Sequence, residues 1–252
     1  MIQRQETKLR LLLIRHGDPD YENDSLTEKG RREAELLAAR LVNERIDKTY
    51  VSTMGRAMDT AAPTLKAKGM EADYCDWLRE FSGRWIERPD KGRLHNICWD
   101  WLPQDWTYRE QLYRYDEWYD EPVMAAGGMK EYHTEITTAF DQMLASHGYE
   151  RDGHIYRVRQ ANDDTIALFS HFGVGCVLIG HLIGTSPMPL WQGFCAAPTS
   201  VTTIYTEERR EGIASFRVAC YGDTTHLHDG GEPVSFSARF CEMYSNEEER
   251  HD

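Results

Sequence analysis

The sequence predicts an α/β fold built on a parallel sheet. Short apolar runs at 9–14, 48–52 and 165–170 have the composition of strands that are covered on both faces. The segments between and after them contain stretches with apolar residues at helical spacing. Alternation of strand and helix is typical of α/β proteins, in which helices cover a mainly parallel sheet.

The first unit is a strand, a polar loop and a helix. The strand is expected at 9–14, and a loop rich in Asp, Pro and Asn follows at 17–25. The helix is expected over 26–45, with Thr27 in the position of an N-cap. Its apolar face consists of four residues at helical spacing: Ala34, Leu37, Ala38 and Leu41.

The second unit repeats this order. We expect a strand at 48–52, a helix at 55–69 and a third strand at 71–75. Pro63 lies inside the expected helix and is predicted to kink or break it, because proline has no backbone N–H to donate.

Regular patterning stops at about 82–128, where five of the seven tryptophans occur. Downstream we expect a helix at 130–148, a strand at 165–170 entering a tight turn at 173–175, a helix at 176–184, and strands at 200–206 and 213–221. We therefore predict a single domain over residues 1–252 with an embedded insertion, a lid or cap, at about 82–128.

The charge of the chain excludes some classes of function. There are 29 Lys and Arg against 42 Asp and Glu, a formal net charge of −13, which disfavours nucleic acid and anionic membranes as partners. The six cysteines form no C-x-x-C pair and are expected to be ordinary buried thiols. No apolar stretch approaches the length of a membrane span, so the expected location is the cytoplasm.

Two apolar strands end in the same way. The first runs into Arg15, His16 and Gly17, and the strand at 165–170 runs into His171. Ligands of open α/β sheets bind beyond the carboxyl ends of the strands, so both histidines are expected at one edge. Arg56 follows the strand at 48–52 and lies in the first turns of the next helix, where the helix dipole also favours an anion. Together the two arginines would suit a phosphoryl group.

Five motifs in this order resemble the histidine phosphatase superfamily, also called phosphoglycerate mutase-like. They are R-H-G at His16, L-T-x-x-G at Thr27, S-x-x-x-R-A-x-x-T-A at Arg56, L-R-E-F-S-G-R-W at Glu80 and S-H-F-G at His171. The resemblance covers most of the chain. It implies a three-layer α/β/α sandwich with a mostly parallel sheet, and a metal-independent phosphomonoesterase that works through a phosphohistidine and needs no cofactor.

The resemblance also implies roles for individual residues. His16 would attack phosphorus through one ring nitrogen while the other donates to a backbone carbonyl. Arg15, Arg56 and His171, with Gly17, would bind the phosphoryl oxygens. Glu80 resembles the proton donor of the family, and Glu87 is its competitor for that role.

Substrate choice is assigned to the insertion and the first loop. The tryptophans and tyrosines of the insertion would form either a lid over the sheet edge or an accessory core that packs on itself or on a second subunit. Arg84, Arg88, Lys91 and Arg93 form a basic cluster that either recognises a second anionic group or is a solvated face. The candidate substrate-binding residues are Tyr21, Asn23, Arg84 and Trp85.

The substrate is expected to be a small phosphorylated metabolite, and a homo-oligomer is left open. One alternative is a mutase with the same site, which is disfavoured because Asn23 is out of register with the family pattern. Another is a non-catalytic module that binds a phospho-ligand or a protein, although none of the expected catalytic residues is missing. The pair His226 and His228 has metal-ligand spacing but no third ligand nearby, and no metal site is predicted.

Overall fold

The computed structural model describes residues 8–82, 84–89, 93–95, 97–237 and 242–248. In this part of the chain the main sheet has eight strands in the order β5-β4-β10-β1-β11-β12-β9-β8. Four neighbouring strands pair in parallel: β5 (Asp73–Cys75), β4 (Lys48–Ser52), β10 (Thr165–Ser170) and β1 (Arg10–Arg15). The other four pair with antiparallel neighbours: β11 (Val201–Arg210), β12 (Ile213–Asp223), β9 (Ile155–Val158) and β8 (Tyr149–Asp152).

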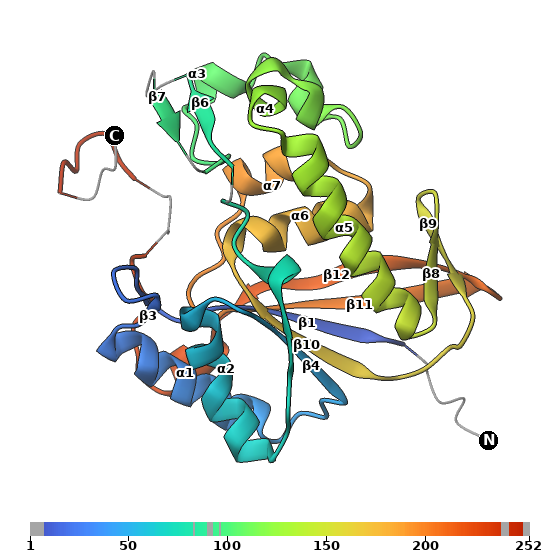
Figure 1. Cartoon of the computed structure of the whole chain (residues 1–252). Coiled ribbons are helices and arrows are strands. Elements are labelled where there is room, and N and C mark those ends of the chain that lie inside the picture. The colour runs from blue at the N-terminus through green and yellow to red at the C-terminus, as the bar shows by residue number, and fades with distance from the viewer. Residues whose placement is uncertain (1–7, 83, 90–92, 96, 238–241, 249–252) are drawn as a thin grey trace.

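Helices cover both faces of this sheet (Figure 1). One layer consists of α1 (Glu28–Leu41) and α2 (Gly55–Lys68), and the other of α5 (Met129–Ser146), α6 (Phe172–Ile183) and α7 (Pro187–Gly193). Successive residues of a strand point to opposite faces, so Leu11 and Leu13 join one core while Leu12 and Ile14 join the other. The predicted α/β sandwich, with a mostly but not entirely parallel sheet, is confirmed.

Helix α1 begins and packs as its sequence predicts. Thr27 is the N-cap, and its side-chain oxygen accepts a hydrogen bond from the backbone N–H of Gly30. All four predicted apolar positions are buried. The helix ends at Leu41, four residues before the predicted end.

Helix α2 corrects the expected break at Pro63, because it runs from Gly55 to Lys68 through that residue. Proline removes one hydrogen bond of the helix, but Ala57, Thr60 and Ala61 are buried on this helix, which packs against α1. Tertiary packing outweighs the loss of a single hydrogen bond.

The expected turn at 173–175 is also corrected, since it forms the first turn of α6 with His171 as N-cap. Gly173 is needed for packing there, because a Cβ at this position would lie 2.3 Å from the Trp99 ring. The sequence prediction did not include the β8–β9 hairpin, α7 or the short helix α8 (Thr225–Asp229).

The insertion contains a small hairpin, short helices and 3-10 turns. Its elements are β6 (Ile86–Arg88), β7 (Arg93–His95), α3 (Pro103–Trp106), η2 (Glu110–Tyr113), η3 (Trp118–Asp120) and α4 (Pro122–Ala126). Trp99, Trp101 and Trp118 are buried in the same core as Leu11 and Leu13 of β1. The structure therefore places these three in the core of the main sheet rather than in an accessory core that packs on itself or on a second subunit. Trp85, in contrast, is 63% exposed.

The thiols correct another expectation. Cys98 and Cys176 are buried, but Cys75 and Cys195 are partly exposed and Cys220 is exposed, while Cys241 lies outside the described residues.

Among the helices of the described ranges, none is long and apolar enough to cross a membrane.

Replacing the central tryptophan of the insertion tests whether it belongs to the common core. Trp118 is fully buried and its ring lies 5.4 Å from that of Trp191 on α7. Trp118→Ala is expected to lower the free energy of unfolding by about 3–5 kcal/mol, because it leaves a large cavity. Urea denaturation measures this, with the exposed Trp85→Ala as a control that changes it by about 0.5 kcal/mol or less. Equal effects of the two changes would contradict the shared core.

Candidate active site

Two histidines meet at the carboxyl edge of the parallel strands. Strands β1 and β10 pair with Arg15 opposite Ser170, so the residues that follow, His16 and His171, become neighbours. Their ring centroids lie 5.1 Å apart, and both side chains are buried. A sequence separation of 155 residues is thus closed by strand pairing.

The geometry defines which nitrogen of His16 is available for attack. Its Nδ1 lies 2.7 Å from the carbonyl oxygen of Gly17. A carbonyl oxygen only accepts, so Nδ1 carries the hydrogen and Nε2 has the free lone pair. Burial lowers the pKa of His16 well below its usual value, and the nearby charges of Arg15 and Arg56 lower it further. The imidazole is therefore neutral and able to act as a nucleophile.

Glycines and a threonine fix the backbone after His16. A Cβ on Gly17 would lie 2.8 Å from the carbonyl oxygen of Gly30, so a larger residue would push α1 away from the loop. The N–H of Gly17 donates to the hydroxyl of Thr60 at 2.9 Å. The Thr60 hydroxyl in turn donates to the carbonyl of Arg56 at 2.7 Å, which links the loop to α2.

His171 is held from the neighbouring strand. Its Nε2 lies 2.8 Å from the hydroxyl of Ser52, the last residue of β4. Burial lowers the pKa of His171 well below its usual value, and the nearby His16 and arginines lower it further. His171 is therefore also neutral. It can donate a hydrogen bond to an anion but adds no positive charge.

The two arginines are both buried, but their partners differ. Arg15 donates to the carbonyl of Ala196. Arg56 donates to the carboxylate of Asp24 at 2.5 Å, and the N–H of Gly55 donates to the same carboxylate at 2.8 Å. A Cβ on Gly55 would lie 2.0 Å from the carbonyl oxygen of Asp24, so only glycine permits this approach.

Glu80 lies beside the first turn of α6. Its Oε1 accepts hydrogen bonds from the N–H of Phe81 at 2.8 Å and from that of Val174 at 3.1 Å. Burial nevertheless raises its pKa, against the lowering effects of these hydrogen bonds and Arg56. Its competitor Glu87 is exposed on β6, where it lines a surface hollow with Arg109. Glu80 is therefore buried and held against α6, whereas Glu87 lies on the surface of β6.

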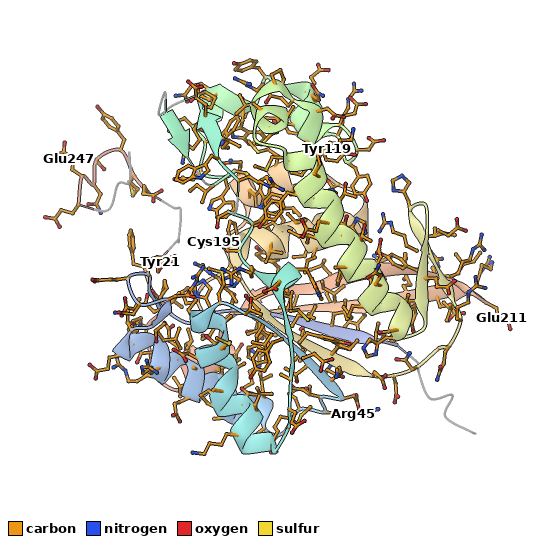
Figure 2. The ribbon with its side chains drawn as sticks, viewed as in Figure 1. Tyr21, Arg45, Tyr119, Cys195, Glu211 and Glu247 are labelled. Atoms are coloured by element: carbon orange, nitrogen blue, oxygen red, sulfur yellow. The ribbon has the colours of Figure 1, made fainter. Side chains whose placement is uncertain are left out.

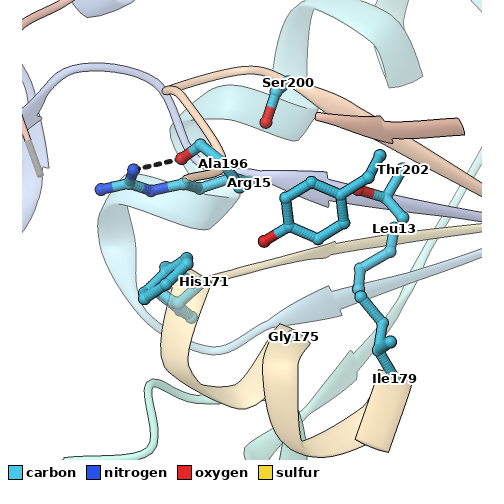
Figure 3. Close-up of a pocket in the computed structure, with 10 residues that line it drawn as sticks. Leu13, Arg15, His171, Gly175, Ile179, Ala196, Ser200 and Thr202 are labelled. Carbon is cyan, nitrogen blue, oxygen red and sulfur yellow. Dashed lines mark hydrogen bonds between the residues drawn. The ribbon is translucent and has the colours of Figure 1, made fainter. Parts of the chain in front are cut away.

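Arg15 and His171 are among the residues that line a small cavity (Figure 3). Its volume is about 20 Å³. Three buried polar atoms that belong to its lining residues have no hydrogen-bond partner within the described part of the chain: Arg15 Nε, His171 Nδ1 and Ser200 Oγ. A space of this size holds at most one water molecule.

The candidate substrate-binding residues lie at different distances from this centre. Figure 2 shows Tyr21 on the loop between β2 (Pro19–Asp20) and β3 (Ser25–Leu26), and its ring lies 5.5 Å from the guanidinium of Arg56. Asn23 donates to Asp20 at 2.8 Å and is exposed. Arg84 lies over the ring of Tyr132, whose hydroxyl donates to the carbonyl of Glu80.

The remaining candidates lie within the insertion. Trp85 faces solvent and lines the same surface hollow as Glu87. The predicted basic cluster is corrected in part, since Arg88 is buried and donates to the carbonyl of Asp100. Lys91 and the side chain of Arg93 lie outside the described residues.

The two histidines near the C-terminus do not share a site. Both lie on α8; His226 is buried and 3.0 Å from the hydroxyl of Thr199, whereas His228 is exposed. Within the described ranges, no group of three or more His, Cys, Asp or Glu side chains could hold a metal ion.

Several residues that hold the site together were not named from the sequence. Ser52 and Thr60 are two of them, although they lie within the S-x-x-x-R-A-x-x-T-A motif, which could have identified them. Asp24 lies in the first loop, where its acidic side chain gave no sign that it would pair with Arg56. Trp99 was assigned to the insertion, and only the packing shows that it abuts Gly173 beside Glu80.

Comparison with known proteins agrees with this geometry. Residues 11–148 match the model of the histidine phosphatase superfamily, branch 1. The chain belongs to the histidine phosphatase superfamily. The motif resemblance is thereby confirmed, and membership in this family of phosphatases supports a phosphoric monoester hydrolase.

Three similar proteins illustrate the family. Phosphoserine phosphatase 1 of Hydrogenobacter thermophilus is 25% identical over 226 residues, which are 84% of this chain and 94% of that protein. A phosphoglycerate mutase from Bacillus anthracis has a similar structure, with a TM-score of 0.59, 17% identity and coverage of 90% of this chain and 98% of that one. A mycobacterial glucosyl-3-phosphoglycerate phosphatase gives a TM-score of 0.54, 16% identity and coverage of 85% and 99%.

The neutral state of His171 predicts a pH dependence of stability. Its pKa is far below the unfolded value of about 6.5, so the unfolded state takes up a proton first as the pH falls. The stabilisation from neutral His171 is therefore complete above pH 6.5, and the free energy of unfolding falls as the pH drops below this value. Between pH 8 and 5, the unfolding free energy of the wild type should fall roughly 2 kcal/mol more than that of His171→Gln. Denaturant titrations at each pH measure this.

A matched control is the exposed histidine of α8. His228→Gln is expected to follow the wild-type pH dependence, because its side chain is 93% exposed. If His171→Gln and the wild type lose equal stability, His171 is protonated in the folded state and the assignment is wrong.

Proposed function

We propose that this protein is a metal-independent phosphomonoesterase that hydrolyses a small phosphorylated metabolite through a phosphohistidine on His16. The observation that carries the proposal is the orientation of His16. Its Nδ1–H donates to the Gly17 carbonyl, which leaves the lone pair of Nε2 free in a neutral ring near two buried arginines. The phosphatases among its relatives support the substrate class.

In the first step, Nε2 of His16 attacks phosphorus in line as the bond to the leaving oxygen breaks. Arg15, Arg56 and His171 donate hydrogen bonds to the phosphoryl oxygens, and the two guanidiniums offset their charge. A protonated Glu80 gives its proton to the leaving oxygen, so the substrate departs as an alcohol. The raised pKa of Glu80 favours the protonated state that this step requires.

In the second step, the Glu80 carboxylate takes a proton from water, whose oxygen attacks the phosphohistidine. The N–P bond breaks, inorganic phosphate leaves and His16 returns to its neutral form. Glu80 is again protonated, so one carboxyl group serves both steps and no net proton is gained or lost by the enzyme.

Substrate selection is proposed for the loop and insertion beside this centre. Tyr21 is the best supported of the four candidates because of its position over Arg56, followed by Arg84, which stacks on the residue bound to the Glu80 carbonyl. Asn23 and Trp85 remain candidates for contacts with the distal part of a substrate.

The wider setting of the protein is also a proposal. The shared core of insertion and sheet supports one domain over residues 1–252 with an insertion at about 82–128. Within the described residues the five cysteines form no disulfide, which suits the reducing cytoplasm. The net charge of −13 disfavours nucleic acid as a partner.

The phosphoenzyme itself tests the mechanism. Acid-labile phosphate that resists base should accumulate on His16 when turnover of a radiolabelled ester is quenched in alkali, because a phosphohistidine survives base. His16→Ala should form none and should lose at least about 10³-fold in kcat. An active enzyme without this intermediate would refute the mechanism. Release of free phosphate identifies a phosphatase, whereas transfer to another hydroxyl of the substrate would identify a mutase.

Leaving-group dependence tests Glu80. Glu80→Gln should lower kcat/KM for an alkyl phosphate by about 10²–10³-fold, since an alkoxide needs a proton to leave. With p-nitrophenyl phosphate the loss in the rate of phosphoenzyme formation should be less than about 10-fold, because nitrophenolate leaves unaided. The control Glu87→Gln should leave both rates unchanged. If Glu87→Gln shows the selective loss instead, the two roles are reversed.

A further inference from the structure

A buried carboxyl group lies on the far side of the catalytic loop from the phosphoryl site. Glu33 of α1 has no exposed surface, and its Oε2 accepts the backbone N–H of Asp18 at 2.8 Å. Its other oxygen, Oε1, is buried and has no hydrogen-bond partner within the described residues. The mechanism above makes no use of this group, although burying a carboxylate in this way is costly.

The hydrogen bonds of Glu33 and His16 meet at one peptide group. The peptide between Gly17 and Asp18 offers its carbonyl oxygen to Nδ1 of His16 and its N–H to Glu33. A trans peptide is planar and its N–H and C=O point in opposite directions. Glu33 and His16 therefore hold the same rigid plane from its two sides.

We propose that Glu33 is a positioning residue, which acts through the Gly17–Asp18 peptide to fix the ring orientation and tautomer of His16 and to strengthen its Nε2 as a nucleophile. A carboxylate at the N–H end polarises the peptide and makes its carbonyl a better acceptor for Nδ1–H. Polar partners behind a histidine fix its tautomer and raise its basicity in the same way at metal sites. This inference rests on the proposed nucleophilic role of His16.

The packing of α1 against the loop supports this role. A Cβ on Gly30 would lie 2.2 Å from the carbonyl oxygen of Asp18, so glycine lets the loop lie directly on the helix that carries Glu33. The Asp18 side chain accepts hydrogen bonds from the hydroxyls of Thr27 and Ser235, which hold the loop at its edge. The peptide group is thus fixed in a position where Glu33 can act on it.

The charges around Glu33 leave it only partly compensated. Lys29 is the nearest cation, with its Nζ 3.7 Å from Oε1, but it lies closer to Glu232 at 2.5 Å and also donates to the carbonyl of Pro233. The acidic groups facing it are Asp18 and Glu232. Burial raises the pKa of Glu33 to about 7, against the lowering effects of the Asp18 N–H and Lys29. Its ionisation therefore falls in the neutral range.

Two substitutions separate the acceptor from the charge. Glu33→Met keeps the volume and removes the acceptor, whereas Glu33→Gln keeps an acceptor oxygen without the charge. The matched control is Glu35→Met, an exposed glutamate on the same helix. The probe is p-nitrophenyl phosphate, followed by rapid quench to obtain the rate of phosphoenzyme formation. Circular dichroism and thermal unfolding check that each variant is folded.

Glu33→Met should slow phosphoenzyme formation about 10–100-fold with KM within about 3-fold, while Glu35→Met should match the wild type. Glu33→Gln should recover most of the rate at pH 6. The rate of the wild type should rise as the pH increases through 7, because Glu33 ionises in this range. Glu33→Gln should lack this rise, because the glutamine side chain does not ionise. Equal rates for Glu33→Met and Glu35→Met, or no recovery in Glu33→Gln, would overturn the proposal.

Nitrogen NMR of ¹⁵N-histidine-labelled protein gives a test that needs no turnover. His16, assigned by the signal lost in His16→Ala, should be the Nδ1–H tautomer in the wild type and in Glu33→Gln. In Glu33→Met its two nitrogen shifts should move toward a tautomer mixture. Unchanged shifts in Glu33→Met would refute the positioning role. If no phosphoester phosphorylates the wild type, the proposed function fails, and the NMR comparison alone decides the role of Glu33.

Discussion

The site depends on the parallel pairing of β1 with β10. This pairing sets Arg15 opposite Ser170, and it therefore sets His16 beside His171. Both strands are buried on both faces, so a slip of one residue would send their apolar side chains into the wrong cores and separate the histidines at the same time. The pairing that buries these strands thus also brings the two histidines together, so stability and chemistry constrain the same two strands.

The strands that carry this constraint were predictable because their signal is local. The apolar runs of β1, β4 and β10 and the apolar face of α1 can be recognised in the sequence. The residues that follow parallel strands lie at one edge of the sheet. Contacts between distant segments were not predictable in this way. Pro63 lies within a helix whose buried face packs against α1, and Gly173 lies against Trp99, which leaves no room for a larger residue. The pairing of Asp24 with Arg56 likewise depends on the fold of a polar loop whose letters suggest only exposure.

Electrostatics divides the site into groups that keep a charge and groups that lose one. Arg15 and Arg56 are the positive charges, while burial and their presence keep His16 and His171 neutral. Burial beside Trp99 has the opposite effect on Glu80 and favours its protonated form. A chain with a net charge of −13 can therefore hold two buried guanidiniums beside two neutral histidines, even though Asp24 pairs with one of these guanidiniums. The overall charge of a protein says little about one buried pocket.

The shared core of the insertion has a consequence for protein engineering. Segments that differ between members of a fold family are attractive units for chimeras, in which the insertion of one enzyme is transplanted into another to change its substrate. Here Trp118 and Trp99 are part of the core that also contains the side chains of β1, and Trp99 abuts the first turn of α6. Exchange of this segment alone would leave a hole beside Glu80, the carboxyl group that we propose as proton donor. A functional chimera must carry α6, α7 and the insertion together, as one packing unit.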